Sequence, residues 1–408
     1  MEEWKKVSLR EVTDIIGDGL HGTPLYSSDG EFAFVNGNNL SDGAVQIKAD
    51  TKMCDLSEYE KYKRDLSDRT LFLSINGTIG NTAKYNGEKI ILGKSACYLN
   101  VKKDYNLDFI YYVLRTPAFQ SAISGLATGT TIKNVSLKII REYEFSVPDY
   151  EGQTRIARVL RAIDDKVELN NRINHNLEEQ AQALYKSWFV DYEPFKGGKF
   201  VDSELGMIPE GWKIGKINDV INLLSGFPFK SSDFQENGDY QLITIKGVQD
   251  GYLDVTSADM LSSLPSKMPQ YCILNIGDIL ISLTGNVGRT CIVDRNNLLL
   301  NQRVAILSPK NIRDSFYVYT MFRSESMKDE LIHLARGTAQ LNLSPIETGE
   351  KLTVIPPDSI LEAFAKVGKG TFNQYISLKK ENIRLMEMRD SLLPKLMSGE
   401  LKINDLSC

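Results

Sequence analysis

The chain has 408 residues, 42% of them hydrophobic and 25% charged, which is the composition of a soluble globular protein with two or three domains. No apolar run approaches the roughly 20 residues of a membrane span, no signal peptide opens the chain, and five scattered cysteines without a CxxC pair exclude a disulfide scaffold and a zinc ribbon. The net charge of −5 argues mildly against nucleic-acid binding, although a small basic cleft can bind DNA within an acidic chain. We therefore expect a cytoplasmic protein.

The chain repeats itself at a spacing of 208 residues, beginning with Trp4-Lys5, which recurs as Trp212-Lys213. The segment SINGTIG (74–80) recurs as SLTGNVG (282–288). Further matches at this spacing, with no gap, are Asp29-Gly30 with Asn237-Gly238, Asp42-Gly43 with Asp250-Gly251, Gly129-Thr130 with Gly337-Thr338, and Val147-Pro148 with Ile355-Pro356. The recurring residues are turn formers and the apolar residues between them, so the pattern predicts a tandem duplication of one fold.

The first copy begins with a predicted globular domain at 1–150. Short apolar runs such as LFLSING (71–77) end at glycine turns and predict buried strands in a compact mixed α/β domain. A long helix is predicted at 151–193, because no Gly or Pro occurs between Gly152 and Pro194. Heptad positions on this helix are filled by Ile156, Leu160, Ile163, Val167, Asn170, Asn174, Leu177, Ala181, Leu184 and Trp188.

The second copy follows a linker at 194–208 and repeats this order. Its globular domain is predicted at 209–357 and its helix at 358–408. We expect this helix to be weak at its start, around Gly368 and Gly370, and regular from about Tyr375 to Pro394, because glycine disfavours helix.

The two helices carry asparagines at equivalent heptad positions, Asn174 and Asn382. A buried Asn at such a position fixes the register of paired helices, which favours packing of the two helices on each other; the alternative is a separate core helix in each domain. The predicted fold is therefore mixed α/β (α+β), with two globular domains separated by two long antiparallel coiled-coil helices in a pseudo-two-fold tandem repeat. Two such domains suit the two halves of a DNA site, which need not be palindromic because the copies can diverge.

Four segments of the chain resemble the specificity subunit of type I restriction–modification enzymes, and the resemblance covers essentially the whole chain. They are LEEQAQALYKSWFVDYEPFKG (177–197), IPEGWK (208–213), GFPFKSSDF (226–234) and SLLPKLMSGEL (391–401). One departure is GDGLHGTPLYSSDG (17–30) in the first copy, so the conformation of that loop is less well predicted.

The resemblance implies two target-recognition domains that read a split, asymmetric DNA site. It also implies docking of two adenine-methylating subunits, and of restriction subunits driven by ATP. The cofactors S-adenosylmethionine, ATP and Mg are then expected on the partner subunits, with none bound by this chain.

Catalytic motifs fail on their spacing or on their context. Gly93-Lys94-Ser95 resembles the end of a phosphate-binding loop, but five residues follow Gly87 where the motif needs four. The nuclease-like series Pro148-Asp149 with Asp164-Asp165-Lys166 has its last members inside the predicted helix. The three histidines lack ligand spacing, and no Asn/Asp-Pro-Pro-aromatic tetrapeptide is present for methyl transfer. The sequence therefore predicts a non-catalytic subunit.

Base-reading residues are expected where polar side chains differ between the two copies within shared loops, because unlike half-sites need unlike readers. In the first domain these are Asn76, Thr78, Asn81, Lys94, Ser95, Thr131 and Lys133. In the second they are Thr284, Asn286, Arg289, Gln302, Arg303, Arg336 and Gln340, with Arg303 and Arg289 the strongest candidates. Thr130 and Thr338 are expected to contact phosphate. The alternative for each is an ordinary solvated loop residue.

The resemblance also implies that partner subunits dock on the helices, and the residues expected there are Leu184, Trp188, Phe189, Leu392 and Leu396. The alternative for Trp188 and Phe189 is packing of the helix end against the second domain. For the whole chain, the alternative functions are a tandem-domain protein–protein scaffold without DNA specificity, and an enzyme whose motifs are unfamiliar.

Overall fold

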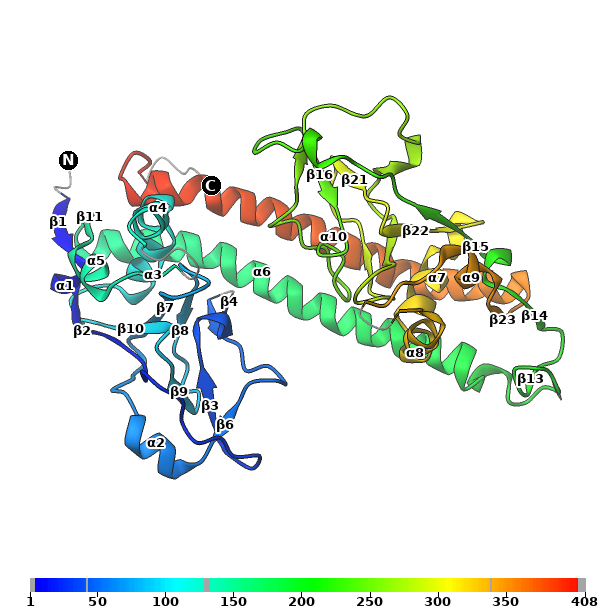
Figure 1. The fold of residues 1–408 in the computed structure, drawn as a ribbon, viewed down its shortest axis with the longest axis horizontal. Coiled ribbons are helices and arrows are strands. Elements are labelled where there is room, and N and C mark those ends of the chain that lie inside the picture. The colour runs from blue at the N-terminus through cyan, green and yellow to red at the C-terminus, as the bar shows by residue number, and fades with distance from the viewer. Residues whose placement is uncertain (1–3, 42, 128–132, 338–339, 403–408) are drawn as a thin grey trace. The chain divides into compact units, whose positions relative to one another are not determined.

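The computed structural model describes residues 4–41, 43–127, 133–337 and 340–402. The chain divides into two compact units, unit 1 (Met1–Lys166 with Leu385–Cys408) and unit 2 (Val167–Arg384). Two long helices, α6 (Tyr150–Tyr185) and α10 (Asp358–Met397), each contribute one part to unit 1 and another to unit 2 (Figure 1). In the described part of the chain, no helix is long and apolar enough to cross a bilayer.

Three sheets make up most of the strand structure of unit 1. The antiparallel sheet has the order β2-β10-β7-β8, β3 pairs in parallel with β9 and antiparallel with β6, and β1 pairs with β11. The strands are β1 (Lys5–Ser8), β2 (Thr13–Asp18), β3 (Phe32–Val35), β4 (Leu40–Ser41), β5 (Ala44–Val45), β6 (Met53–Cys54), β7 (Thr70–Ser74), β8 (Thr82–Lys84), β9 (Ile90–Leu92), β10 (Ala96–Val101) and β11 (Glu144–Val147). The inner strands β7 and β10 are buried throughout, which explains their unbroken apolar runs.

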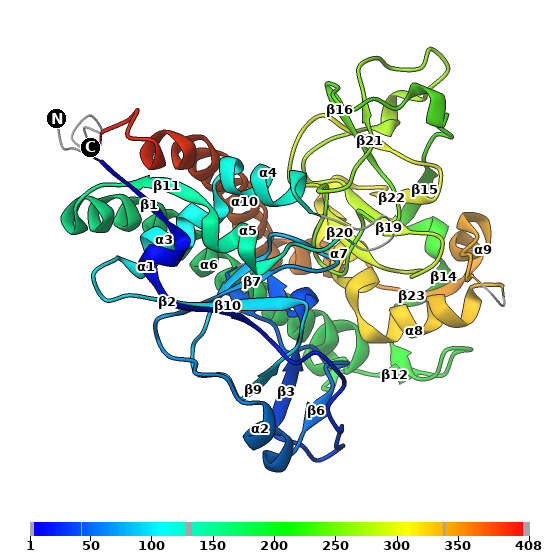
Figure 2. The same cartoon turned by 60° about the vertical axis from the view of Figure 1, so that its left-hand side comes forward.

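The helices α1 (Leu9–Val12), α3 (Leu107–Arg115), α4 (Pro117–Gly125) and α5 (Leu137–Glu142) pack on one side of the four-stranded sheet. The helix α2 (Leu56–Tyr62) instead packs with β3, β6 and β9. The Asn106 side chain caps α3 by accepting from the backbone N–H of Phe109, and Thr116 caps α4 in the same way. In both views α2 and the sheet of β3, β6 and β9 lie on the side of the four-stranded sheet away from α3 and α6 (Figure 2).

Unit 2 repeats the three main sheets of this plan, and the sheet that corresponds to β6-β3-β9 has a fourth strand in unit 2. Its antiparallel sheet has the order β15-β22-β19-β20, β16 pairs in parallel with β21, and β14 pairs with β23. The strands are β12 (Phe200–Val201), β13 (Ile208–Pro209), β14 (Lys213–Lys216), β15 (Ile221–Ser225), β16 (Tyr240–Ile243), β17 (Met260–Leu261), β18 (Ile273–Leu274), β19 (Ile279–Ser282), β20 (Thr290–Ile292), β21 (Leu298–Leu300), β22 (Val304–Pro309) and β23 (Leu352–Ile355). The helices are α7 (Ser315–Arg323), α8 (Glu325–Leu334) and α9 (Pro345–Glu350). The predicted mixed α/β class and tandem repeat are confirmed.

The pairing of one edge strand differs between the two copies, although the spacing of 208 residues is the same before and after that strand. Val101 on β10 pairs with Thr13, whereas Asn100 pairs with Ile15, so Asp14 has no opposite residue. In unit 2 the corresponding pairs follow each other without interruption, from Pro309 with Ile221 to Ser308 with Asn222. The first copy thus has one unpaired residue in its edge strand, a β-bulge that the second copy lacks.

The long helices differ from their predicted extents. The α-helical part of α6 ends at Tyr185, a π-helical turn (Lys186–Val190) follows, and Tyr192 adopts a left-handed conformation with φ 52°. The predicted weak start of α10 is not observed, because the helix is continuous from Asp358. Glycine is needed at 368 for packing: a Cβ there would lie 1.9 Å from Cε1 of Phe316.

Within unit 2, α6 and α10 run antiparallel. The Asn170 Nδ2 donates to Asn382 Oδ1 over 2.9 Å, and Asn382 Nδ2 donates to Asn171 Oδ1 over 2.8 Å. In the π-helical turn after α6, the Phe189 ring packs on Phe364, near the start of α10. The role expected for Asn174 is corrected, because this buried side chain makes no hydrogen bond in the described part of the chain and Asn170 takes its place.

Candidate nucleic-acid interface

Three chain segments meet around Leu283 in unit 2. The backbone N–H of Leu283 donates to the Arg303 carbonyl over 3.0 Å, and the Leu343 N–H donates to the Leu283 carbonyl over 2.7 Å. The turn after β19, the turn between β21 and β22, and the segment before α9 are therefore fixed to one another by backbone hydrogen bonds. Such bonds hold side chains on different loops at defined positions.

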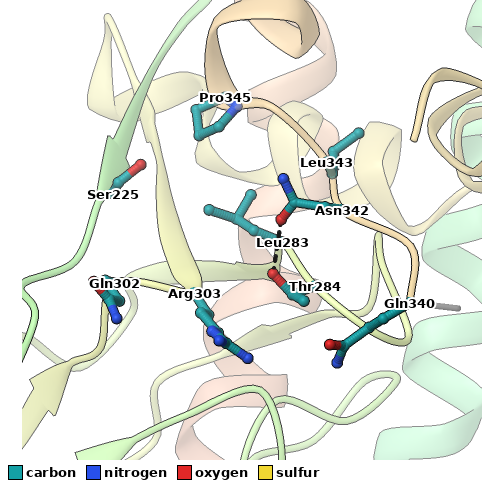
Figure 3. Close-up of a pocket in the computed structure, with 9 residues that line it drawn as sticks. All are labelled: Ser225, Leu283, Thr284, Gln302, Arg303, Gln340, Asn342, Leu343 and Pro345. Carbon is teal, nitrogen blue, oxygen red and sulfur yellow. Dashed lines mark hydrogen bonds between the residues drawn. The ribbon is translucent and has the colours of Figure 1, made fainter. Parts of the chain in front are cut away.

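A cavity of about 420 Å³ opens between these segments (Figure 3). Its lining residues are Ser225, Leu283, Thr284, Gln302, Arg303, Gln340, Asn342, Leu343 and Pro345. The Thr284 hydroxyl donates to Asn342 Oδ1 over 2.9 Å across the cavity wall. None of the nine lining residues is acidic, so the cavity presents one cationic side chain among neutral amides and hydroxyls.

Arg303 has a fixed backbone and an exposed side chain. Its backbone N–H donates to Asn301 Oδ1 over 3.3 Å, and the next residue, Val304, begins the buried part of β22. Among the described residues, the guanidinium has no hydrogen-bond or ion-pair partner. The exposed amides of Gln302 and Gln340 line the same cavity. Four predicted readers, Thr284 included, therefore come together.

Unit 1 has the same backbone arrangement at the corresponding residues. The Ile75 N–H donates to the Ser95 carbonyl over 2.9 Å, and the Val135 N–H donates to the Ile75 carbonyl over 2.9 Å. The Gly77 N–H donates to the Lys133 carbonyl over 3.2 Å. The predicted loops of the first domain thus also meet at one place, although their residues are up to about 60 positions apart in sequence.

Two predicted readers in unit 1 make hydrogen bonds that hold the fold. The Ser95 hydroxyl donates to Asn36 Oδ1 and accepts from the Gly37 N–H, each over 2.8 Å. The Asn81 amide donates to the Leu40 carbonyl over 2.8 Å. Of the other predicted readers, Asn76 is half-buried and Thr78, Lys94 and Lys133 are exposed.

In unit 2, Arg289 does not line the cavity. Its Nη1 donates to Gln249 Oε1 over 2.7 Å, and the residue is half-buried, so its standing as a strong candidate is corrected. Arg336 is exposed and pairs with Glu347 over 2.6 Å, and Asn286 lies exposed on the turn after β19. Thr130, Thr131 and Thr338 lie outside the described residues.

Sequence reasoning missed two polar residues of the cavity, Ser225 and Asn342. Asn342 is identical to its counterpart Asn134, and it was not predicted because base-reading residues were expected only where the two copies differ. The structure shows both roles in one side chain, because Asn342 holds Thr284 and faces the cavity. Ser225 ends β15, beside Ala305 of β22, and no turn motif marks it. Its proximity to the cavity follows only from strand pairing.

The predicted docking residues mostly pack within their own units. Phe189 is buried in the core of unit 2 and Leu396 in that of unit 1, so both predictions are corrected. Leu184, Trp188 and Leu392 are half-buried against the same cores. Phe189 packs on Trp212 and Tyr317 of the second domain, as the alternative predicted, whereas Trp188 packs on Phe364 of α10.

An ion pair on α6 fixes each globular domain to its helices. In unit 2, Arg323 Nε lies 3.0 Å from Glu178, which also accepts from the Tyr319 hydroxyl over 2.6 Å. Burial raises the pKa of Tyr319 well above its ordinary value, so this hydroxyl stays protonated and donates. In unit 1, Arg115 lies 3.1 Å and Arg389 2.8 Å from Asp164.

The thiols and carboxylates show no sign of metal or redox chemistry in the described part of the chain. Cys54, Cys97, Cys272 and Cys291 are buried, and burial raises the pKa of Cys97 and Cys291, which keeps both thiols protonated. No group of three or more His, Cys, Asp or Glu side chains there could hold a metal ion.

Known proteins resemble this chain over both of its copies. The family model described as type I restriction modification DNA specificity domain matches residues 1–179 and 209–358. The MjaIX specificity subunit of Methanocaldococcus jannaschii is 29% identical over 73% of this chain and 70% of its own length. The EcoBI specificity subunit of Escherichia coli is 24% identical over 98% of this chain and 86% of its own. A crystal structure of the S subunit from M. genitalium has the same fold, with a TM-score of 0.54 at 19% identity, covering 97% of this chain and 96% of that one.

Proposed function

Since the chain belongs to the family of type I restriction modification DNA specificity domains, we propose that it is the sequence-reading subunit of a type I restriction–modification complex. Each globular domain reads one half of a split DNA target. The observation that carries this proposal is the loop cluster around Ile75 and Leu283, which has the same backbone hydrogen bonds in both units but different exposed side chains.

The difference in side chains favours an asymmetric target. Unit 1 exposes Lys94 and Lys133 at its cluster, whereas unit 2 exposes Gln302, Arg303 and Gln340. Lysine and arginine suit guanine or phosphate, and glutamine suits adenine. Since the two sets would select different bases, the two half-sites differ in sequence. The pair of helices α6 and α10, as an antiparallel coiled coil, would set the spacing between them.

The chemistry belongs to other subunits in this proposal. Adenine methylation by S-adenosylmethionine, and restriction with ATP and Mg, take place on partner chains that this subunit brings to the target. A groove of about 470 Å³ in unit 2 offers a docking surface for a methylating subunit. Val190 and Met207 border it and are 45% and 55% exposed, and large exposed apolar side chains at a groove are typical of protein interfaces.

Single-molecule sequencing of DNA from cells that express this chain with its partner methyltransferase tests the proposal. We expect N6-methyladenine in both halves of a split, asymmetric motif. Cells that express the methyltransferase without this chain are the control and should show no such motif. A palindromic motif, or none, would contradict the proposal. A tandem scaffold for proteins, the competing function, would enrich no sequence from a random DNA pool.

A further inference from the structure

We infer that the second domain reads a guanine in its half-site through Arg303, and that the neighbouring amides of Gln302 and Gln340 contact adjoining bases. The inference rests on the proposed function, because it assigns one base to one side chain of that interface. It concerns unit 2 alone, and the argument has three steps.

The first step is the unsatisfied guanidinium. Other arginines of unit 2 have partners: Arg289 donates to Gln249, Arg323 pairs with Glu178, and Arg336 pairs with Glu347. Arg303 alone of these four lines the cavity, and its guanidinium has no partner among the described residues. Its backbone is held from both sides, by Leu283 and by Asn301. A guanidinium without a partner, on a backbone that is held in place, is suited to donate hydrogen bonds to acceptors on a ligand.

The second step is the chemistry of the surrounding cavity. A guanidinium can donate two parallel hydrogen bonds, and guanine presents two acceptors, O6 and N7, in the major groove. Gln302 and Gln340 beside it offer paired amide donors and acceptors, which match adenine N6 and N7. No lysine lines the cavity, whereas lysines are common among phosphate contacts. The set of side chains therefore favours base edges over the DNA backbone.

The third step explains why this position reads DNA in one unit only. In unit 1, Asn36 and the Gly37 N–H hold the hydroxyl of Ser95, the counterpart of Arg303. A side chain at Gly37 could not be accommodated, because its Cβ would lie 2.9 Å from that of Ser74. Unit 2 has Thr244 and Ile245 at these two positions, and neither holds Arg303. The side chain at the equivalent turn is thus fixed in unit 1 and free in unit 2.

The test compares the methylation motif of the full chain with those of its variants, each with the partner methyltransferase. Arg303→Ala should lower discrimination at one guanine of the second half-site by roughly 5- to 150-fold and leave the first half-site unchanged. Arg303→Gln keeps a polar side chain and should shift the preference at that base away from guanine. The matched control is Lys94→Ala in unit 1, which should change only the first half-site or overall affinity.

A base analogue separates a base contact from a phosphate contact. Replacing that guanine by 7-deazaguanine removes N7, so it should weaken binding of the unmodified chain and leave the already weakened binding of Arg303→Ala unchanged. Equal loss of affinity on all sequences, or an unaltered motif in a folded Arg303→Ala variant, would overturn the inference while leaving the proposed function intact. Failure of the unmodified chain to select any motif would overturn both.

Discussion

The contact between helix and globular domain is built in opposite ways in the two units. In unit 1, Leu160 of α6 is fully buried in the core. Its counterpart in unit 2 is Gly368 of α10, where the Phe316 ring covers the helix backbone. The residue that corresponds to Phe316 is Asp108, which pairs with Lys84 over 2.5 Å and with Arg161 over 3.1 Å. Large and small side chains have thus exchanged sides, and the backbone fold is preserved because the pair changed together.

The ion pairs that hold the domains also depart from the repeat. Exact repetition would place the second acid on α10, but Asp164 and Glu178 both lie on α6. Their counterparts by the repeat are Phe372 and Met386, which carry no charge. The helix that binds each domain by charge is therefore the same one in both units, so substitutions at matched positions should have unequal effects.

The largest effect is expected from Glu178→Ala. Arg323, whose side chain is 11% exposed, would lose its buried partner and keep only Asp250, which is 48% exposed, so we expect the free energy of unfolding of unit 2 to fall by up to about 3–5 kcal/mol. Asp164→Ala should cost unit 1 less, because that carboxylate is 24% exposed. Hydrogen exchange in denaturant, followed separately for amides of each unit, measures both losses. A larger loss for Asp164→Ala would contradict the comparison.

The exchanged packing should give the next largest effects. Leu160→Ala would leave a cavity in unit 1 and lower its free energy of unfolding by about 2–5 kcal/mol. Gly368→Ala should destabilise unit 2 by about 1–3 kcal/mol by overpacking. The Phe316 ring has little room to move, since it stacks on Phe364 with 5.0 Å between centroids.

Gly370→Ala is the control for the glycine substitution. No atom lies within 4 Å of the position its Cβ would take, so the better helix propensity of Ala should stabilise the helix by about 0.5–1 kcal/mol. The same exchange measurements apply. If both glycine substitutions stabilised unit 2, the close contact with Phe316 would not determine the residue at 368.

Substitutions at Ser95 and Arg303 should have opposite effects: the first should lower stability, and the second should change DNA recognition. Ser95→Ala removes two hydrogen bonds and should cost unit 1 about 1 kcal/mol, with the methylation motif unchanged. Arg303→Ala should change stability by less than about 0.5 kcal/mol, because the side chain is exposed and unpaired in the described part of the chain. Thermal unfolding of both variants, with motif sequencing, provides the measurements. A relaxed first half-site in Ser95→Ala would show that this residue does read DNA.

The smallest effect is a pH dependence confined to unit 1. Burial raises the pKa of Asp108, but Lys84 and Arg161 outweigh it and hold that pKa below its ordinary 3.8. The stabilisation from ionised Asp108 is therefore complete above that pH and is lost as the pH falls through the folded value. Asp108→Asn should remove this part of the acid sensitivity. Unit 2, with Phe316 at the equivalent position, should not respond at this contact.

The sequence was informative where local patterns decide the structure. Glycine turns and apolar runs predicted paired strands in two copies, and the loops proposed to read DNA do meet in each unit. Other residues depended on partners far away in the chain. Ser95 was predicted to bind DNA, but its hydroxyl donates a hydrogen bond to Asn36, which lies 59 residues earlier in the chain. Gly368 predicted a weak start of the helix because glycine has a low helix propensity. The sequence does not show that the Phe316 ring packs against this position and leaves no room for a side chain. Phe189 and Leu396 were predicted to contact partner subunits but are buried in the cores of their own units, and such burial depends on tertiary packing.

The bulge at Asp14 has a consequence for how such a repeat can change over generations. The unpaired residue sits in β2, at the edge of its sheet, and the pairing of β10 with β7 continues without a shift. A shift of one residue in the pairing is therefore tolerated at this edge, whereas the same shift in β10 would turn buried side chains to the opposite face. The edge strand allows the two copies to differ in strand pairing while their inner strands stay aligned.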